Sequence, residues 1–315
     1  YNQVINMNKE LNLLEFLHKE QVSAAICDEI ASYQALYNKG TNQQRIPQPH
    51  YLYYGKDVWE QAAAALLCGE NLLLVGEKAT GKNVLAENLA AAFARPSWNI
   101  SFHINMDASF MIGTDTFQNG AVTFRPGPVY ACAQNGGFAI LDEINMARNE
   151  ALAVLHSLLD YRRIIDVPGY DIIHLHKAAR FIATMNYGYA GTRELNEALL
   201  SRFVVIKLPE ISSENLQKLL QDEFPALKPK ALQQFSALFF DLQKKCQQAE
   251  ISSKAVDLRG LLAAIRLMRQ GLTARTALQM GITNKALDTY EPELIKDCIA
   301  MRIPEKLTPE KIFED

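Results

Sequence analysis

Several features that would assign this chain to a particular class of protein are missing from its sequence. Cysteine is scarce, and the five that occur form no C-x-x-C pair. This pattern argues against a disulfide-stapled secreted domain and is typical of free thiols in a reducing cytoplasm. A run of about 18 apolar residues, as a membrane-spanning helix needs, is absent. So is the basic-then-apolar start of a signal peptide. We therefore predict a cytoplasmic protein with no membrane partner. The cysteines are Cys27, Cys68, Cys132, Cys246 and Cys298.

An excess of charge of one sign is also missing. The 32 basic and 35 acidic side chains leave a net charge of −3. The chain therefore has no global basic field, and it has no basic stripe with interleaved aromatic residues, so we predict no nucleic-acid partner. With 49% hydrophobic and 21% charged residues, the composition is that of an ordinary globular protein. The chain begins with Tyr1 rather than Met, which is consistent with a fragment or a processed protein.

The most informative stretch is residues 71–89, NLLLVGEKATGKNVLAENL. Leu72–Val75 predicts a short buried strand, and the apolar positions after Asn83 predict a helix. Between them lies the pattern G-x-x-x-x-G-K. A glycine-rich turn of this kind points backbone N–H groups and the helix N-terminus at a bound phosphate, and Lys82 can reach the β- and γ-phosphates. The alternative is a glycine turn with no ligand. The predicted phosphate-binding residues are Gly76, Glu77, Lys78, Ala79, Thr80, Gly81, Lys82, Asn83 and Val84.

The loop departs from the usual pattern at the residue after the lysine. A Ser or Thr hydroxyl normally binds Mg²⁺ there, and this chain has Asn83. An amide oxygen is also a hard donor, so we predict Asn83 as a metal ligand of altered geometry. Glu77 and Lys78 replace the more usual loop start and add a carboxylate near the phosphate. Both departures are expected to weaken nucleotide binding or slow turnover.

An acidic pair follows a later apolar run. Gly137–Leu141 predicts a buried strand, and Asp142 and Glu143 come directly after it. In an open parallel sheet, the carboxyl ends of the strands form the ligand-binding edge. Asp142 would hold the water shell of Mg²⁺, and Glu143 would accept the proton of an attacking water. Two solvated charges that cap a strand are the alternative, which the phosphate loop upstream disfavours.

The order of the predicted elements indicates the fold. Five apolar runs alternate with helices, which favours a doubly wound α/β fold with a parallel sheet. From Ser212 onward, nearly every segment is predicted to be helical. We predict three parts: an N-terminal helix (7–38) and linker over 1–50, an α/β domain over 51–210, and a small all-α domain over 211–315. The predicted strands are 72–75, 98–104, 137–141, 181–185 and 203–208.

Smaller elements interrupt this alternation. Asn119 and Gly120 predict a hairpin turn within residues 107–125, and Pro168 and Gly169 predict a second hairpin over 164–173. Residues 149–160 predict an amphipathic helix. His174 and His176 have metal-ligand spacing, but because no third ligand is nearby in the sequence, we favour a solvated hairpin edge.

The block from Phe124 to Arg202 carries a family resemblance. It contains RPGPVY, FAILDEINMA, YRRIIDVPGY, FIATMN and LNEALLSRF in one order and spacing. The chain is similar over about residues 52–270 to AAA+ ATPases of the MoxR type, near the CbbQ/NorQ and dynein-related (AAA_5) branches. The resemblance implies a P-loop NTPase core with a five-stranded parallel sheet and an all-α lid domain. It also implies ATP and Mg²⁺ as cofactors.

The resemblance implies further roles, residue by residue. Asp142 and Glu143 match the Walker B metal ligand and general base, and Asn186 matches sensor 1, which orients the attacking water. Arg202 matches the arginine finger, which acts on the neighbouring subunit's nucleotide, and Arg259 matches sensor 2 of the lid. Taken alone, Asn186 could cap a strand, Arg202 could pair with a local carboxylate, and Arg259 could lie along its helix.

The function that this resemblance implies is ATP hydrolysis in a ring-shaped homo-oligomer, a hexamer in the family. The two hairpin segments correspond to inserts that face the ring pore or a partner. In the family, that partner is often a von Willebrand A-domain protein, and the outcome is activation of a complex or insertion of a metal cofactor. A nucleotide-binding switch that barely hydrolyses is the alternative, motivated by Asn83 and Glu77. The net charge disfavours a third hypothesis, a GTP-driven nucleic-acid enzyme.

Overall fold

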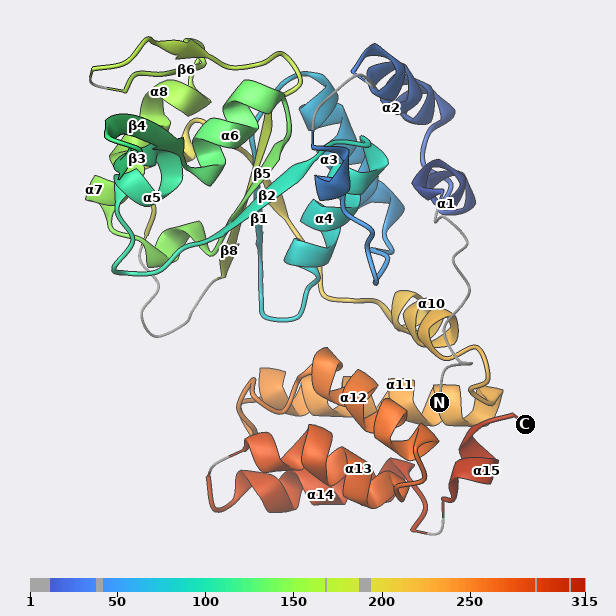
Figure 1. Cartoon of the computed structure of the whole chain (residues 1–315). Coiled ribbons are helices and arrows are strands. Elements are labelled where there is room, and N and C mark those ends of the chain that lie inside the picture. The colour runs from blue at the N-terminus through green and yellow to red at the C-terminus, as the bar shows by residue number, and fades with distance from the viewer. Residues whose placement is uncertain are drawn as a thin grey trace. The chain divides into compact units, whose positions relative to one another are not determined.

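The computed structural model describes residues 12–37, 42–167, 169–186, 194–286, 288–305 and 307–314. The chain divides into two compact units. The first comprises residues 1–77 and 81–209, and the second comprises residues 78–80 and 210–315. Figure 1 shows the α/β layers of the first unit and the helices of the second.

A five-stranded sheet forms the centre of the first unit. Its strands lie in the order β2-β5-β8-β1-β9, and every neighbouring pair is parallel. The fold class expected from the alternating apolar runs and helices is therefore confirmed. The strands are β1 (Leu72–Gly76), β2 (Ser97–Ser101), β5 (Phe138–Asp142), β8 (Arg180–Asn186) and β9 (Val204–Lys207).

Helices cover both faces of this sheet, which explains why the inner strand β1 is apolar throughout. Leu72 and Leu74 of β1 belong to one apolar cluster, whereas Leu73 and Val75 belong to another. Successive side chains of a strand point to opposite faces, so a strand that is covered on both sides needs apolar residues at every position. Helices α3 (Lys56–Leu67) and α4 (Lys82–Ala92) contribute to the first cluster, and α6 (Pro128–Asn135) contributes to the second.

The predicted helix over residues 7–38 is wrong as a single element. Two helices occupy its described part, α1 (Leu13–Lys19) and α2 (Ala24–Leu36), and residues 7–11 and 38 lie outside the described residues. Gln21 between them has a φ of 61°, which no α-helix can accommodate. Leu17 and Ile30 are fully buried in the first apolar cluster, so both helices pack on the α/β unit.

The predicted helix over residues 149–160 is also interrupted. It consists of α7 (Asn149–Leu152), a 3₁₀ turn and α8 (His156–Leu159). Each piece still buries leucines in the second cluster, so the apolar pattern is correct although the helix is not continuous. Two shorter helices, α5 (Ala108–Ile112) and α9 (Glu197–Leu200), complete the α-helices described for the first unit.

Two hairpins project from the first unit at the predicted positions. The first, β3 (Gly113–Gln118) and β4 (Ala121–Pro126), turns at Asn119 and Gly120, whose φ angles of 53° and 82° fit a type I′ turn. The second, β6 (Ile164–Ile165) and β7 (Ile173–His174), is much shorter. Its predicted turn residue Pro168 lies outside the described residues.

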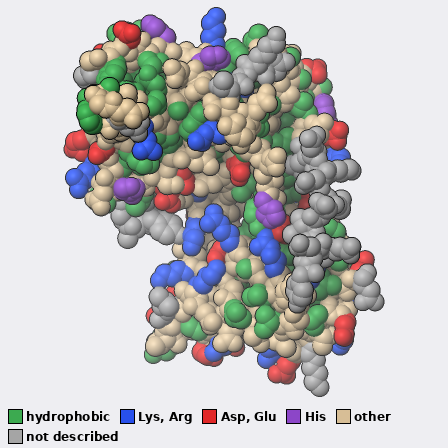
Figure 2. All heavy atoms as spheres, viewed as in Figure 1, with side chains coloured by type: hydrophobic (Ala, Val, Ile, Leu, Met, Phe, Trp, Pro, Cys, Tyr) green, Lys and Arg blue, Asp and Glu red, His purple; other side chains and the backbone are tan. Residues whose placement is uncertain are grey.

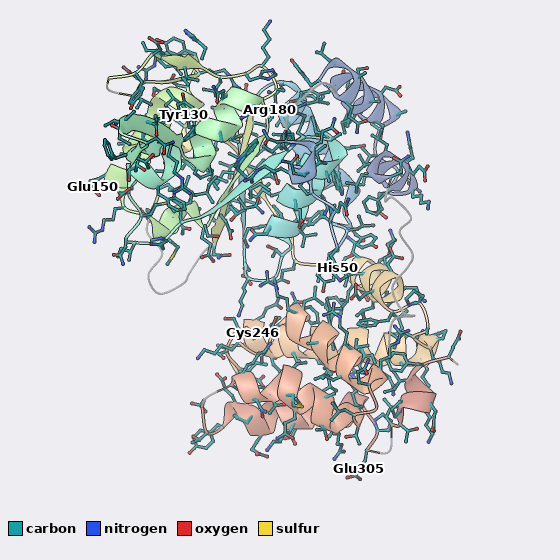
Figure 3. The ribbon with its side chains drawn as sticks, viewed as in Figure 1. His50, Tyr130, Glu150, Arg180, Cys246 and Glu305 are labelled. Carbon is teal, nitrogen blue, oxygen red and sulfur yellow. The ribbon has the colours of Figure 1, made fainter. Side chains whose placement is uncertain are left out.

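Contacts between side chains tie the two hairpins together. The Tyr170 hydroxyl donates to Asp115 Oδ1 at 2.5 Å, and the Tyr170 ring lies 5.0 Å from that of Phe124. Phe124 also contacts Tyr130 of α6, which Figure 3 labels. On the outer side, Phe117 and Val122 are paired across the hairpin and exposed. Figure 2 shows hydrophobic side chains at the surface over this region.

The second unit is helical. Helices α12 and α13 approach so closely that a Cβ added at Gly260 would lie 2.1 Å from the carbonyl oxygen of Gly281. Glycine at this crossing therefore lets the two backbones touch. The α-helices of this unit are α10 (Ser213–Glu223), α11 (Pro229–Gln247), α12 (Leu258–Arg269), α13 (Ala274–Gly281), α14 (Glu291–Arg302) and α15 (Pro309–Ile312).

Candidate functional site

The glycine loop lies where the sequence places it, between the carboxyl end of β1 and the first turn of α4. Gly81 has a φ of 84°, in the region that favours glycine, and directly precedes α4. A Cβ at Gly81 would lie 3.1 Å from the ring of Tyr53, a buried residue beneath the loop. The backbone conformation therefore favours glycine here, and the Tyr53 ring leaves little room for a side chain. Ala79 also has a positive φ, of 66°, so the loop curls twice before the helix begins.

Lys82 is buried against this loop. Its side chain, in a residue only 7% exposed, donates to the carbonyl oxygens of Gly76 at 3.0 Å and Glu77 at 2.6 Å. Burial lowers the pKa of Lys82 to about 8, against the opposing effect of the negative charges of Asp142, Glu143 and Glu77. The ammonium group therefore lies within electrostatic reach of the acidic pair, in a place where an anion would strengthen its charged form.

Asp142 is the last residue of β5, and its carboxylate is oriented by a neighbouring strand. The Thr184 hydroxyl donates to Asp142 Oδ1 at 2.7 Å. The same hydroxyl accepts the backbone N–H of Glu143 at 3.1 Å. Thr184 is 1% exposed, so this one buried hydroxyl holds both members of the acidic pair.

Glu143 is held in an uncommon conformation beside Asn186. Its φ of 54° and ψ of 47° place it in the left-handed region, where a residue with a side chain is disfavoured. Asn186 Nδ2 donates to Glu143 Oε1 at 3.0 Å, and Asn145 Nδ2 in turn donates to the carbonyl oxygen of Asn186 at 3.2 Å. The Oδ1 atom of Asn145 is buried and has no hydrogen-bond partner among the residues that the structure describes. A polar chain thus links the predicted base, the predicted sensor and the loop after β5.

The sheet register brings these residues to one edge. Gly76 of β1 pairs with Asn186 of β8, and Leu141 of β5 pairs with Ala183 of β8. The edge therefore combines a buried lysine, an anion-seeking loop at a helix N-terminus, and carboxylate and amide oxygens. This donor set fits a Mg²⁺-bound polyphosphate, since Asp142 and the exposed Asn83 in the first turn of α4 offer oxygen ligands.

Arg202 lies elsewhere in the same unit, just before β9. Its Nε donates to the carbonyl oxygen of His156 at 3.1 Å, and its Nη1 donates to the carbonyl oxygen of Ala198. Its Nη2 lies 3.7 Å from Asp160 Oδ2. The local carboxylate pairing that the sequence left open is therefore present, and within this chain Arg202 is anchored to its own subunit.

Arg259 belongs to the second unit. It is exposed in the first turn of α12, and its backbone N–H donates to Asp257 Oδ1 at 3.1 Å. Lys285 pairs with the same Asp257 side chain. The edge described above is built from first-unit strands, so Arg259 is not among the residues that they bring together.

Sequence reasoning missed three side chains that hold the predicted site residues, namely Thr184, Asn145 and Asp160. Thr184 precedes Asn186 by two positions on one strand, and period-two alternation would have placed the two on the same face. Asn145 and Asp160 carry no comparable signal in the sequence. Their contacts join segments that are adjacent only in the folded chain.

The paired histidines lie at the exposed hairpin edge that the sequence favours over a metal site, His174 in β7 and His176 two residues after it. Within the described ranges, no three His, Cys, Asp or Glu side chains are grouped so that they could hold a metal ion. Both histidines are exposed; Nδ1 of His176 also accepts the Ala178 N–H at 3.0 Å, and its ring contacts Tyr37. Among the helices that the structure describes, none is both long and apolar enough to span a membrane.

The sheet order, the lysine-bearing loop after the inner strand β1 and the acidic pair at the end of β5 define a P-loop nucleotide-binding domain. Comparison with known proteins agrees with this class. The model of the AAA domain, dynein-related subfamily, matches residues 71–203. That range contains the loop, the acidic pair, Asn186 and Arg202.

Relatives extend the match beyond this domain. YojN of Bacillus subtilis (strain 168) is 33% identical over 241 residues, which cover 75% of this chain and 79% of that protein. SAB1265c of Staphylococcus aureus (strain bovine RF122 / ET3-1) is 31% identical over 258 residues, covering 80% and 98%. An ATPase candidate of known structure from Cytophaga hutchinsonii aligns at a TM-score of 0.45 and 14% identity, over 92% of this chain and 96% of that one. The chain is therefore a member of one family with YojN and the staphylococcal protein, and its residues 71–203 place it among the AAA+ proteins.

Proposed function

We propose that this protein hydrolyses ATP with Mg²⁺ as a ring-forming AAA+ ATPase of the MoxR type. The observation that carries the proposal is the contact of 3.0 Å between Asn186 Nδ2 and Glu143 Oε1 at the same edge as Lys82 and Asp142. A carboxylate held by an amide donor, beside a cation that fits phosphate, is the arrangement needed to activate and orient a water molecule.

Each residue of this edge has a chemical task in the proposed reaction. Lys82 and the loop N–H groups bind the β- and γ-phosphates, and Glu143 accepts a proton from water as its oxygen attacks the γ-phosphorus. The bond from that phosphorus to the β–γ bridging oxygen breaks, and ADP and phosphate leave. Asp142 and Asn83 would hold Mg²⁺, which neutralises charge on the phosphates. Asn186 keeps the base and the water aligned.

The neighbouring subunit completes the proposed site. Arg202 has its guanidinium anchored on its own subunit, and a ring would present it to the nucleotide of the next subunit, where it stabilises charge on the transferring phosphoryl group. AAA+ domains generally form oligomeric rings, and a homo-hexamer is the proposed state. The two hairpins, with exposed Phe117 and Val122, would contact a client protein. A von Willebrand A-domain protein is the proposed client, and its activation or metal-cofactor insertion the proposed outcome.

A nucleotide-dependent switch with little hydrolysis is the second candidate. Glu77 is exposed in the loop, and Asn83 replaces a hydroxyl ligand of the metal. Extra negative charge near the phosphates and a longer amide ligand for the metal both weaken binding of the transition state. Both features therefore favour slow turnover. Competition of ATP against GTP, in the same assay, tests the base preference of either candidate.

The deciding experiment is phosphate release with Mg²⁺ and ATP across a range of protein concentrations. We expect a rate per subunit that rises with concentration. It should fall by about 10²- to 10⁴-fold in Glu143→Gln, because the base is lost while ATP binding is kept. A Glu143→Gln variant as fast as the parent would contradict the proposed mechanism. ATP binding without steady-state release in the parent would favour the switch.

A further inference from the structure

The Arg202 side chain is held at three points. Two are neutral carbonyl oxygens, of His156 and Ala198, and the third is the carboxylate of Asp160. An arginine has five N–H donors in one rigid plane, so contacts to Nε, Nη1 and Nη2 fix both the position and the rotation of that plane. Of these partners, Asp160 alone is charged.

Asp160 is itself fixed by a second arginine. Arg162 Nη2 lies 2.7 Å from Asp160 Oδ2, and Arg162 Nε lies 3.1 Å from Oδ1. The Asp160 side chain is only 13% exposed, whereas those of Arg202 and Arg162 are 24% and 47% exposed. The carboxylate is thus largely covered while both guanidinium groups keep a solvent-facing part. Hydrogen bonds from Arg162, with smaller effects from the charges of both arginines, lower the pKa of Asp160 to about 2, so it stays ionised.

The backbone around this cluster is also held. Buried Asn71, which directly precedes β1, donates through Nδ2 to the carbonyl oxygens of Leu159 at 2.9 Å and of Arg202 at 3.0 Å. The residue before Asp160 and Arg202 itself therefore share one donor. This common anchor sets the distance between the two chain segments that meet in the ion pair.

We propose that Asp160 is a positioning residue that holds the Arg202 guanidinium ready for the nucleotide of the neighbouring subunit. This inference rests on the proposed trans-acting role of Arg202. A free arginine side chain would have to lose its rotational freedom each time it meets the phosphoryl group, whereas an anchored one has already lost it. Asp160 therefore acts on the site of the next subunit and not on the nucleotide bound by its own subunit.

The first test compares Asp160→Asn with Glu150→Gln. Glu150 is exposed on α7, at the margin of the first unit in Figure 3, and makes none of the described contacts to Arg202, so its replacement removes one negative charge from the same unit. We expect kcat of Asp160→Asn to fall by about 10- to 100-fold, as for other residues that orient a reacting group. Its Kd for ADP, measured by titration, should stay within about twofold of the parent, as should both values for Glu150→Gln. A parental kcat in Asp160→Asn would overturn the proposal.

Mixed rings provide a readout that a purely structural role would not move. An Asp160→Asn subunit keeps its own nucleotide site, and a Glu143→Gln subunit keeps its arginine. In a random one-to-one mixture, about one interface in four combines the intact halves. We expect the mixture to recover about a quarter of the parental rate per subunit, well above either variant alone. Asp160→Ala is carried through the same mixtures, so that the conclusion does not depend on the folding of one variant.

A matched mixture separates this inference from the proposed function. Arg202→Ala mixed with Glu143→Gln should recover in the same way. If it recovers while both Asp160 variants with Glu143→Gln stay inactive, Asp160 does not act through Arg202 and the inference is wrong. If the Arg202→Ala mixture also stays inactive, the trans-acting arginine itself fails, and the inference fails with it.

Discussion

Two regions of the first unit carry the predicted chemistry, and they are supported in different ways. The nucleotide edge, formed by Lys82, Asp142, Glu143 and Asn186, lies at the carboxyl ends of parallel strands and at the start of α4. Buried side-chain hydrogen bonds from Thr184 and Asn145 hold it in place. The Arg202 cluster lies at the ends of short helices, and backbone carbonyl groups and one carboxylate hold it.

This difference indicates which part of the proposed site is built within one subunit and which part acts between subunits. The ends of parallel strands in register are close to one another, so the residues of the nucleotide edge all come from one subunit. The Arg202 cluster instead orients a side chain that, in the proposed mechanism, acts on the nucleotide of the next subunit. The two regions should therefore respond differently to substitution and to mixing of subunits.

Replacing Thr184 by Val should have the largest effect of the three changes that sharpen this comparison. The variant removes the hydroxyl that donates to Asp142 and accepts from Glu143. We expect a loss of about 1–3 kcal/mol in unfolding free energy and a fall in kcat of about 10- to 100-fold. Mixing with Arg202→Ala should recover activity, because a Thr184→Val subunit keeps its arginine. Mixing with Glu143→Gln should not.

Thr116→Val is the matched control for this change. Thr116 lies on the exposed hairpin strand β3, where its hydroxyl pairs with Thr123, so its replacement should alter stability by less than about 0.5 kcal/mol. An effect of Thr184→Val as small as that of Thr116→Val would show that the acidic pair is held by other means.

The second effect is a loss of nucleotide affinity at high pH. Because burial lowers the pKa of Lys82 to about 8, the free protein loses this positive charge as the pH rises through that value, and bound phosphate must restore it. The Kd for ADP should therefore increase by up to about tenfold per pH unit above pH 8. Titration at several pH values measures this slope, and Lys82→Met should flatten it. The range from about pH 7 to about pH 9 extends roughly one unit to either side of that pKa. If the Kd of the parent for ADP does not change across this range, Lys82 is not the phosphate-binding group.

The same shift has the opposite sign for the stability of the free protein. The lowered pKa means that the folded state binds fewer protons than the unfolded state between the folded value of about 8 and the ordinary value of 10.5. The contribution of Lys82 to the free energy of unfolding, measured without nucleotide, should therefore rise with pH across this window. Opposite trends in affinity and stability would identify the lysine.

The smallest expected effect is that of Asn83→Thr. A threonine hydroxyl in the first turn of α4 is shorter than the amide and suits the octahedral shell of Mg²⁺. The Mg²⁺ concentration that gives half the maximal rate should fall by roughly two- to fivefold. Asn83→Ala, which offers no oxygen ligand, is the control. If Asn83→Thr instead turns an inactive protein into a steady-state ATPase, the parent is a switch.

The sequence predicts more of the fold and the nucleotide edge than of what supports them. Alternation and apolar runs predict the five strands, because a strand such as Leu72–Val75, covered on both faces, has to be apolar at every position. The spacing G-x-x-x-x-G-K predicts the loop because glycine is needed where the backbone curls. These signals are local, so they can be recognised in a short stretch of sequence without knowledge of the rest of the chain.

Breaks in helices, and the contacts that support the site residues, are harder to predict from the sequence. The left-handed conformation of Gln21 interrupts a region whose apolar pattern continues through it, so periodicity alone predicts one helix. Asp160 is one carboxylate among many in the sequence, and its contact with Arg202 depends on where α8 and α9 end. Such residues become visible only when the distances between segments are known.

The hydrogen bond between Tyr170 and Asp115 has a consequence for how the two hairpins can change in evolution. These residues are 55 positions apart, yet the hydroxyl of one needs the carboxylate of the other. A chimera that receives only β3 and β4 from a relative with no acid at position 115 would lose that acceptor and loosen the second hairpin. We therefore expect the two hairpins to be kept or exchanged together in evolution, and substitutions at positions 115 and 170 to be correlated among relatives.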